Sequence, residues 1–115
     1  MHELSIAEAI LERVSAEAER HPHGRFTKVG IRMGELSGVD PDALSFGFEV
    51  LVQNTKWDPL TLQIEFSPRM QRCPGCAHEF RAPDSETRCP QCGNSATECI
   101  GGHELDIVYM EVEEE

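Results

Sequence analysis

The sequence predicts an α+β (mixed α/β) protein, with two helices on a small three-stranded mixed sheet and a cysteine-rich module inserted before the last strand. Three observations lead to this fold class. Apolar residues recur at helical spacing in two segments, and they alternate with polar residues in two others. A stretch rich in Cys, Pro and Gly then separates these segments from a last strand-like one. A chain of 115 residues has room for one modest core and a smaller satellite.

The first helix is predicted close to the start of the sequence. Its apolar residues follow one another at three- and four-residue spacing: Leu4, Ala7, Leu11, Val14 and Ala18. Ser5 and Glu8 match a capping box near the helix start. Pro22 and Gly24, in the stretch HPHG, are expected to end the helix.

Two segments show the alternation of strands with one buried face. In residues 26–33 (FTKVGIRM) the predicted buried side chains are Val29, Ile31 and Met33. In residues 60–66 (LTLQIEF) they are Leu60, Leu62, Ile64 and Phe66. The connection between these two strands contains a helix, so we expect a right-handed crossover and a parallel strand pair.

The second helix is predicted to begin directly after Asp40. Asp40 is a good N-cap residue, Pro41 suits the first helical position, and Asp42 favours the positive end of the helix dipole. The apolar face of this helix consists of Leu44, Phe48, Leu51 and Val52.

The last strand is predicted in residues 104–112 (ELDIVYMEV), where the apolar phase shifts between Ile107 and Val108. We expect this strand to rejoin the first two, with either a parallel or an antiparallel pairing. Residues 1–68 and 102–115 are therefore expected to form an α/β domain, with residues 69–101 as an inserted domain.

The composition limits the classes of partner. The formal net charge is −11 and the sequence pI is about 4.8. Such a surface repels nucleic acid and anionic membranes, and it attracts cations and basic protein surfaces.

No apolar run approaches the roughly 20 residues that a membrane-spanning helix needs. The N-terminal segment carries three glutamates and lacks the basic region of a secretory signal, so a cytoplasmic protein is expected.

Four of the five cysteines form a pattern typical of a metal site. Cys73-Pro-Gly-Cys76 and Cys89-Pro-Gln-Cys92 are separated by twelve residues. Each CxxC turn directs two sulfurs at one centre, and two such turns supply the four thiolates that zinc favours. A closed four-cysteine site has no open coordination position. The pattern therefore predicts a structural zinc ion in a zinc-ribbon domain.

Other interpretations of the cysteine module have less support. Iron in a rubredoxin-like site uses the same geometry, but aromatic residues near the motifs are sparse. Thioredoxin-like chemistry uses one CxxC motif rather than two facing pairs. His78 is expected to be exposed or to support the site, and Cys99 to be a small semi-buried residue. Basic and acidic residues are balanced in the module, which argues against nucleic-acid binding.

The first three residues, MHE, offer a second set of metal donors. They comprise an amine, a deprotonatable backbone amide, an imidazole and a carboxylate. Planar sets of nitrogen and oxygen donors suit Ni(II) or Cu(II). This motif alone is a weak signal.

Four segments of the sequence resemble the HypA/HybF family of hydrogenase nickel-incorporation proteins. These are MHELSIAEAI, GELSGVDPDALSFGFE, the CPGC–CPQC pair and GGHELDI, in the order and at the length typical of that family. The resemblance implies a nickel metallochaperone with a nickel domain at the N-terminus and an inserted zinc-ribbon domain. It also implies cooperation with the nickel-binding GTPase HypB and delivery of Ni(II) into the large subunit of [NiFe]-hydrogenase.

The resemblance also implies which residues hold the metals. His2 becomes the essential nickel ligand, and the Met1 amine and Glu3 complete or support the set. Asp40 is the next candidate for nickel ligation or support, beside its role as a helix cap. The zinc ligands are expected to be Cys73, Cys76, Cys89 and Cys92.

Alternatives from other classes remain open at this point. One is a zinc-ribbon adaptor for proteins or nucleic acids without a nickel role. Another is a small enzyme, although no nucleophile–base pair, phosphate loop or HExxH motif supports catalysis. The pair His21 and His23 is an alternative, adventitious metal site. A monomer or a weak homodimer is expected.

Overall fold

The computed structural model describes residues 3–82 and 87–114, and it divides into two compact units. The first unit comprises the chain up to Arg32, Gly38–Glu65 and the chain from Asp106. The second comprises Met33–Ser37 and Phe66–Leu105.

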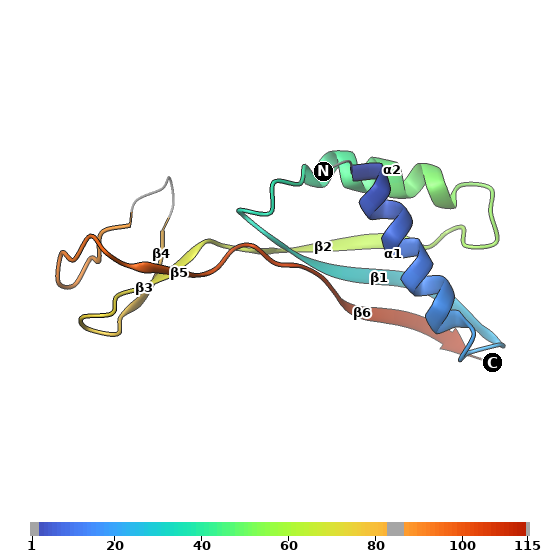
Figure 1. Ribbon diagram of the computed structural model, residues 1–115. Coiled ribbons are helices and arrows are strands. Elements are labelled where there is room, and N and C mark those ends of the chain that lie inside the picture. The colour runs from blue at the N-terminus through green and yellow to red at the C-terminus, as the bar shows by residue number, and fades with distance from the viewer. Residues whose placement is uncertain (1–2, 83–86, 115) are drawn as a thin grey trace. The chain divides into compact units, whose positions relative to one another are not determined.

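The first unit is an α+β layer structure, as the sequence predicted. Its three-stranded sheet has the order β2–β1–β6, so the last strand does rejoin the first two. Helices α1 and α2 contact each other and lie on one face of this sheet (Figure 1). The elements are α1 (Glu3–Ala18), β1 (Gly24–Gly34), α2 (Pro41–Val52), β2 (Thr61–Ser67) and β6 (Leu105–Glu114).

Strands β1 and β2 are parallel. The Thr61 hydroxyl donates a hydrogen bond to the Thr27 carbonyl (3.3 Å), and Arg32 forms an ion pair with Glu65 (3.2 Å). Residue numbers therefore increase in the same direction along both strands. This confirms the parallel pair expected of a strand–helix–strand crossover.

Strand β6 is antiparallel to β1, which makes the sheet mixed. Thr27 donates a hydrogen bond to the Glu111 carbonyl (3.3 Å), whereas the Gly34 amide donates to the Glu104 carbonyl (2.7 Å). Between these contacts, the Tyr109 ring lies directly over Gly30, and a Cβ atom at Gly30 would come within 2.0 Å of it. Gly30 is therefore buried, although it alternates along the strand with the apolar residues that were predicted to form the buried face.

Helix α1 is rotated relative to the predicted apolar stripe. Its buried residues are Ile6, Ala7, Ile10 and Val14. The prediction for Leu4 was wrong, because 49% of this residue is exposed. The predicted capping box was also wrong, because Glu3 is already helical and Ser5 therefore lies inside the helix.

Helix α2 begins as predicted. The Asp40 carboxylate accepts hydrogen bonds from the amides of Asp42 (3.0 Å) and Ala43 (3.3 Å), and Pro41 is the first helical residue. Leu44, Phe48 and Val52 are buried, while Leu51 is half-buried. The cap thus fixes the direction in which α2 leaves the preceding loop.

The two outer strands agree with the predictions only in part. Leu60 is buried and Leu62 and Ile64 are half-buried, but Phe66, predicted to be buried, is 60% exposed. The half-buried residues of β6 confirm the predicted change of phase, since they are Leu105, Ile107, Met110 and Val112.

The second unit contains a three-stranded antiparallel sheet of order β4–β3–β5. Its strands are β3 (Met70–Arg72), β4 (Glu79–Arg81) and β5 (Glu98–Gly101). Gln71, in the central strand, is only 2% exposed, and its amide nitrogen donates to the Thr97 hydroxyl at 3.0 Å. The loop after β1 also belongs to this unit, because the Leu36 amide donates to the Gly102 carbonyl at 2.6 Å.

Among the described residues, no helix combines the length and the apolar character that crossing a membrane requires.

Candidate metal centre

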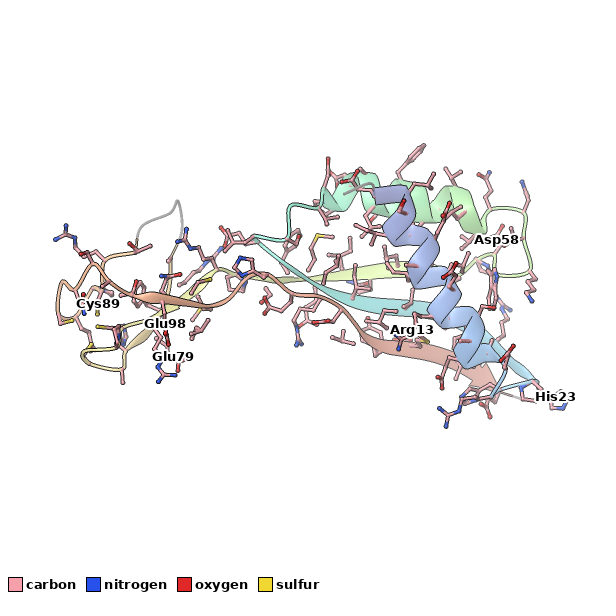
Figure 2. The ribbon with its side chains drawn as sticks, viewed as in Figure 1. Arg13, His23, Asp58, Glu79, Cys89 and Glu98 are labelled. Carbon is pink, nitrogen blue, oxygen red and sulfur yellow. The ribbon has the colours of Figure 1, made fainter. Side chains whose placement is uncertain are left out.

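Four cysteine sulfurs converge in the second unit, as the two CxxC motifs predicted. All four Sγ atoms lie within 4.8 Å of one another. The closest pairs join the two motifs, with Cys73 Sγ 3.4 Å from Cys92 Sγ and Cys76 Sγ 3.6 Å from Cys89 Sγ. All four are free thiols rather than disulfides. Figure 2 shows the sulfur atoms together near Cys89.

The first motif forms a tight turn closed by backbone hydrogen bonds. The Ala77 amide donates to the Cys73 carbonyl (2.8 Å), and the Cys73 amide donates to the His78 carbonyl (3.0 Å). Ala77 has a φ of 62°, in the left-handed region that favours glycine. The turn therefore holds a non-glycine residue in a strained backbone conformation.

The second motif repeats the same turn. The Gly93 amide donates to the Cys89 carbonyl (2.9 Å), and the Cys89 amide donates to the Asn94 carbonyl (2.9 Å). Gly93 has a φ of 77° at the position that corresponds to Ala77. Two equivalent turns therefore present one buried and one exposed cysteine each to the common centre.

The two thiols of the first turn differ in pKa, although each accepts a hydrogen bond from a backbone amide. The Cys76 amide, which donates to the Cys73 sulfur, lowers the pKa of Cys73 to about 6. The His78 amide lowers the pKa of Cys76, but burial and the neighbouring Cys89 sulfur together raise that pKa to about 12. One thiol of this turn is thus ionised at neutral pH, while the other keeps its proton.

The second turn shows the same inequality. Burial raises the pKa of Cys89, but the amides of Cys92 and Gln91 bring it below its ordinary value. The Asn94 amide lowers the pKa of Cys92, but the Cys73 sulfur and burial bring it above its ordinary value. The N-terminal cysteine of each turn is therefore the one that ionises first.

The donor set fits a tetrahedral metal ion. Zn–S bonds of about 2.3 Å at tetrahedral angles place the sulfurs about 3.8 Å apart, and the sulfurs here lie close to that spacing. Amide-to-sulfur hydrogen bonds also stabilise thiolates, the form that binds metal. The four cysteines therefore form a metal-binding cluster.

His78 and Cys99 both belong to the second unit. His78 is half-buried, its ring stacks on Phe80 at a centroid distance of 5.8 Å, and its amide donates to Cys76. The expectation for Cys99 was wrong, because this thiol is exposed. Cys99 lies in a short edge strand, where its Sγ donates to the Gly101 carbonyl (3.3 Å) and lies 3.9 Å from His103 Nδ1.

Of the candidate nickel residues, the structure describes Glu3 and Asp40, which both belong to the first unit. Met1 and His2 lie outside the described residues. Glu3 and Asp40, separated by 36 residues in sequence, are brought together, since the Asp40 amide donates to Glu3 Oε2 at 3.5 Å. The Asp40 carboxylate caps α2 through Oδ1.

His21 and His23, the alternative metal-binding pair, differ in their exposure. His21 is half-buried, its Nδ1 bonds to Glu114, and its Nε2 lies 3.7 Å from a Glu17 carboxylate oxygen. His23 is exposed. Sequence reasoning missed both glutamates. Glu17 is only four residues before His21, a spacing that the sequence shows, whereas Glu114 comes close to His21 only in the folded sheet. Within residues 3–82 and 87–114, the four cysteines are the one group of three or more metal-ligating side chains close enough to share an ion.

Comparisons with known proteins give a consistent family assignment. The family model "Hydrogenase/urease nickel incorporation, metallochaperone, hypA" matches residues 1–112. A hydrogenase maturation factor HypA from Alkalilimnicola ehrlichii is 38% identical over 113 residues, which is 98% of this chain and 100% of the relative. A HypA from a Roseiflexus species is 38% identical over 116 residues, covering 100% of this chain and 94% of the relative.

Solved structures show the same fold. The solution structure of the Ni metallochaperone HypA from Helicobacter pylori superimposes with a TM-score of 0.66 at 20% identity, over all of both chains. Another solution structure of a HypA protein gives a TM-score of 0.72 at 21% identity, covering 100% of this chain and 98% of the other. The family match across the chain and the two close relatives lead to one conclusion. This chain belongs to the HypA family of hydrogenase and urease nickel-incorporation metallochaperones.

Proposed function

We propose that this protein is a nickel metallochaperone without catalytic turnover, which binds Ni(II) at its N-terminus and delivers it during maturation of [NiFe]-hydrogenase. The observation that carries the proposal is the family match, which begins at residue 1 and extends through the cysteine cluster. It includes both the MHE segment and the metal-binding module.

In this proposal His2 is the essential nickel ligand, with the Met1 amine and Glu3 completing the set. Nitrogen and oxygen donors on consecutive residues close small chelate rings, which suit Ni(II). The hydrogen bond from the Asp40 amide to the Glu3 carboxylate supports the arrangement, because it ties the first described turn of α1 to the start of α2. Asp40 thus supports Glu3 through its backbone and caps α2 through its side chain.

A site with few side-chain ligands on a chain end suits a carrier. An incoming set of donor atoms can approach such a site and displace its ligands one at a time. The net charge of −11 favours the approach of a cation and of a basic partner surface. Nickel is therefore the cargo of the protein rather than a fixed part of it.

The cysteine cluster has a different role in the proposal. Zn(II) on Cys73, Cys76, Cys89 and Cys92 stabilises the second unit, whose short strands bury few side chains.

The partners are the nickel-binding GTPase HypB and the large subunit of [NiFe]-hydrogenase, and the protein acts in the cytoplasm.

Calorimetric titration with Ni(II) tests the site directly. The zinc-loaded protein with its own N-terminus is compared with His2→Ala and with a version extended by one residue. We expect stoichiometric binding in the first and loss of that binding in the other two. His23→Ala is the matched control, because it removes an exposed histidine elsewhere and should bind normally. Normal nickel binding by both N-terminal variants would refute the proposed site.

A further inference from the structure

Three large apolar side chains are exposed on the helical layer of the first unit. Phe46 is 67% exposed and Val50 is 50% exposed, both on α2, and Leu4 on α1 is 49% exposed. These residues do not belong to the core face of either helix, which consists of other side chains. Exposed aromatic and aliphatic side chains that lie together are typical of protein-binding surfaces.

The three side chains form one continuous patch. Phe46 and Val50 are four residues apart on a helix, so their side chains are neighbours. Gly47 lies between them in sequence, and a Cβ atom at Gly47 would meet a Leu4 methyl carbon at 3.7 Å. Leu4 therefore lies against α2 at Gly47, next to Phe46 and Val50. We call Leu4, Phe46 and Val50 the apolar patch.

Acidic residues border the apolar patch. Asp42 precedes Phe46 by four residues and Glu49 follows it by three, so both flank the ring on the helix surface, and both are exposed. Glu8, also exposed, follows Leu4 by four residues. Within Glu3–Ala18 and Pro41–Val52 the only basic residue is Arg13, about two and a half turns from Leu4 along α1 (Figure 2).

The acidic border decides among the possible occupants. A second copy of the chain would bring an identical acidic border against this one, and each copy carries a net charge of −11. Nucleic acid and anionic membranes are repelled for the same reason. A helix with apolar side chains on one face and lysines or arginines beside them matches both the patch and its border.

We propose that the apolar patch is a docking surface for a basic amphipathic helix of a partner protein. The inference rests on the proposed function, in which a partner must approach the N-terminal end of α1 to receive nickel. Leu4 follows Glu3 directly, so the patch begins beside the candidate nickel residues. A partner helix bound there would bring its own metal ligands close to the cargo and would orient the transfer.

The test uses the zinc-loaded full chain, labelled with ¹⁵N, and two synthetic helical peptides. One peptide carries leucines on one face and lysines beside them, and the other has glutamates in place of the lysines. We expect the lysine peptide to shift the amide resonances of Leu4, Phe46, Gly47 and Val50, and to bind more weakly as salt is added. We expect the glutamate peptide not to bind.

Variants locate the site independently of the spectra. The double variant Phe46→Ser/Val50→Ser should weaken binding of the lysine peptide by about tenfold or more. Phe66→Ser is the matched control, because Phe66 is similarly exposed at 60%, and it should bind like the unaltered protein. Equal binding by the double variant and the control, or binding of both peptides alike, would overturn the proposal.

Two further measurements separate this proposal from its alternatives. Nickel titration of the double variant should give unaltered stoichiometry, so a failure of docking is distinguished from a failure of the nickel site. Sedimentation at increasing protein concentration should show no self-association through the patch. Self-association that the double variant abolishes would make a second copy the occupant and would contradict the proposal.

Discussion

The backbone amide of Asp40 donates a hydrogen bond to the carboxylate of Glu3, with a distance of 3.5 Å between the nitrogen and Oε2. The same residue caps α2 through its side chain, so Asp40 contacts the first turns of both helices. These two contacts use different atoms of Asp40. Substitutions can therefore separate its capping role from a role in nickel binding.

Asp40→Ala should reduce the free energy of unfolding by about 1 kcal/mol, because it removes the acceptor for the amides of Asp42 and Ala43. Asp40→Asn should leave stability within a few tenths of a kcal/mol, since asparagine caps helices about as well. Chemical denaturation at fixed zinc concentration measures both. Asp40→Asn should also retain its nickel affinity, because the backbone amide that holds Glu3 is unchanged. Loss of nickel binding in a fully stable Asp40→Asn protein would instead make the carboxylate a nickel ligand.

The two cysteine turns predict opposite effects for a matched pair of substitutions. Ala77→Gly should stabilise the second unit by about 1 kcal/mol, because it relieves a left-handed conformation at φ 62°. Gly93→Ala should destabilise it by about the same amount, since φ is 77° there and no atom within 4 Å would obstruct the new methyl group. Thermal unfolding at a fixed free zinc concentration provides the comparison. Shifts of the same sign in both variants would show that the two turns are not equivalent.

Zinc uptake at pH 7 should release fewer than four protons from the four cysteines. Zinc binds thiolates, and Cys73, with a pKa lowered to about 6, is already ionised at that pH. Cys76, with a pKa raised to about 12, must lose its proton on binding. As pH falls below 6, Cys73 becomes protonated in the metal-free protein, so the number of released protons rises and the zinc affinity falls. Calorimetry in buffers of different ionisation enthalpy counts these protons. A number of released protons that stays constant between pH 5 and 7 would contradict the lowered pKa of Cys73.

Gly30→Ala should destabilise the first unit by about 1–3 kcal/mol, because the new methyl group collides with the Tyr109 ring. Urea denaturation of the zinc-loaded protein measures the loss. The double variant Gly30→Ala/Tyr109→Ser should recover part of the lost stability. The double variant Gly30→Ala/Tyr109→Phe should not, because phenylalanine keeps the ring. Equal stabilities of the two double variants would show that the ring is not the obstacle.

The cysteine cluster and the start of α2 could be predicted because short-range chemistry determines both. A CxxC turn positions its own two sulfurs, and Asp40 caps the amides of residues two and three positions further on. The parallel strand pair followed from the two alternating segments and the crossover between them, whereas the sense in which the last strand pairs did not. The cysteine cluster and the cap of α2 depend little on the rest of the fold.

Most of the predictions that were wrong concern features that depend on contacts between distant segments. Apolar residues lie on two adjacent rows of α1, so spacing alone did not decide between Leu4 and Ile6, and packing buried Ile6. The Ser5–Glu8 pattern suggested a cap, but the helix already includes Glu3. Alternation in β2 was extended to Phe66, which lies at the end of the strand where its side chain is exposed. The contact between Glu3 and Asp40 had no sequence signal that spacing could detect.

Nickel transfer tests the central claim most directly. The nickel-loaded protein is mixed with HypB, GTP and the metal-free large subunit of [NiFe]-hydrogenase, in the presence of a chelator that removes free nickel. The nickel content of the reisolated large subunit is then measured. We predict that nickel reaches the subunit from the unaltered protein and not from His2→Ala treated in the same way. Equal incorporation from His2→Ala, or from nickel in buffer alone, would contradict it.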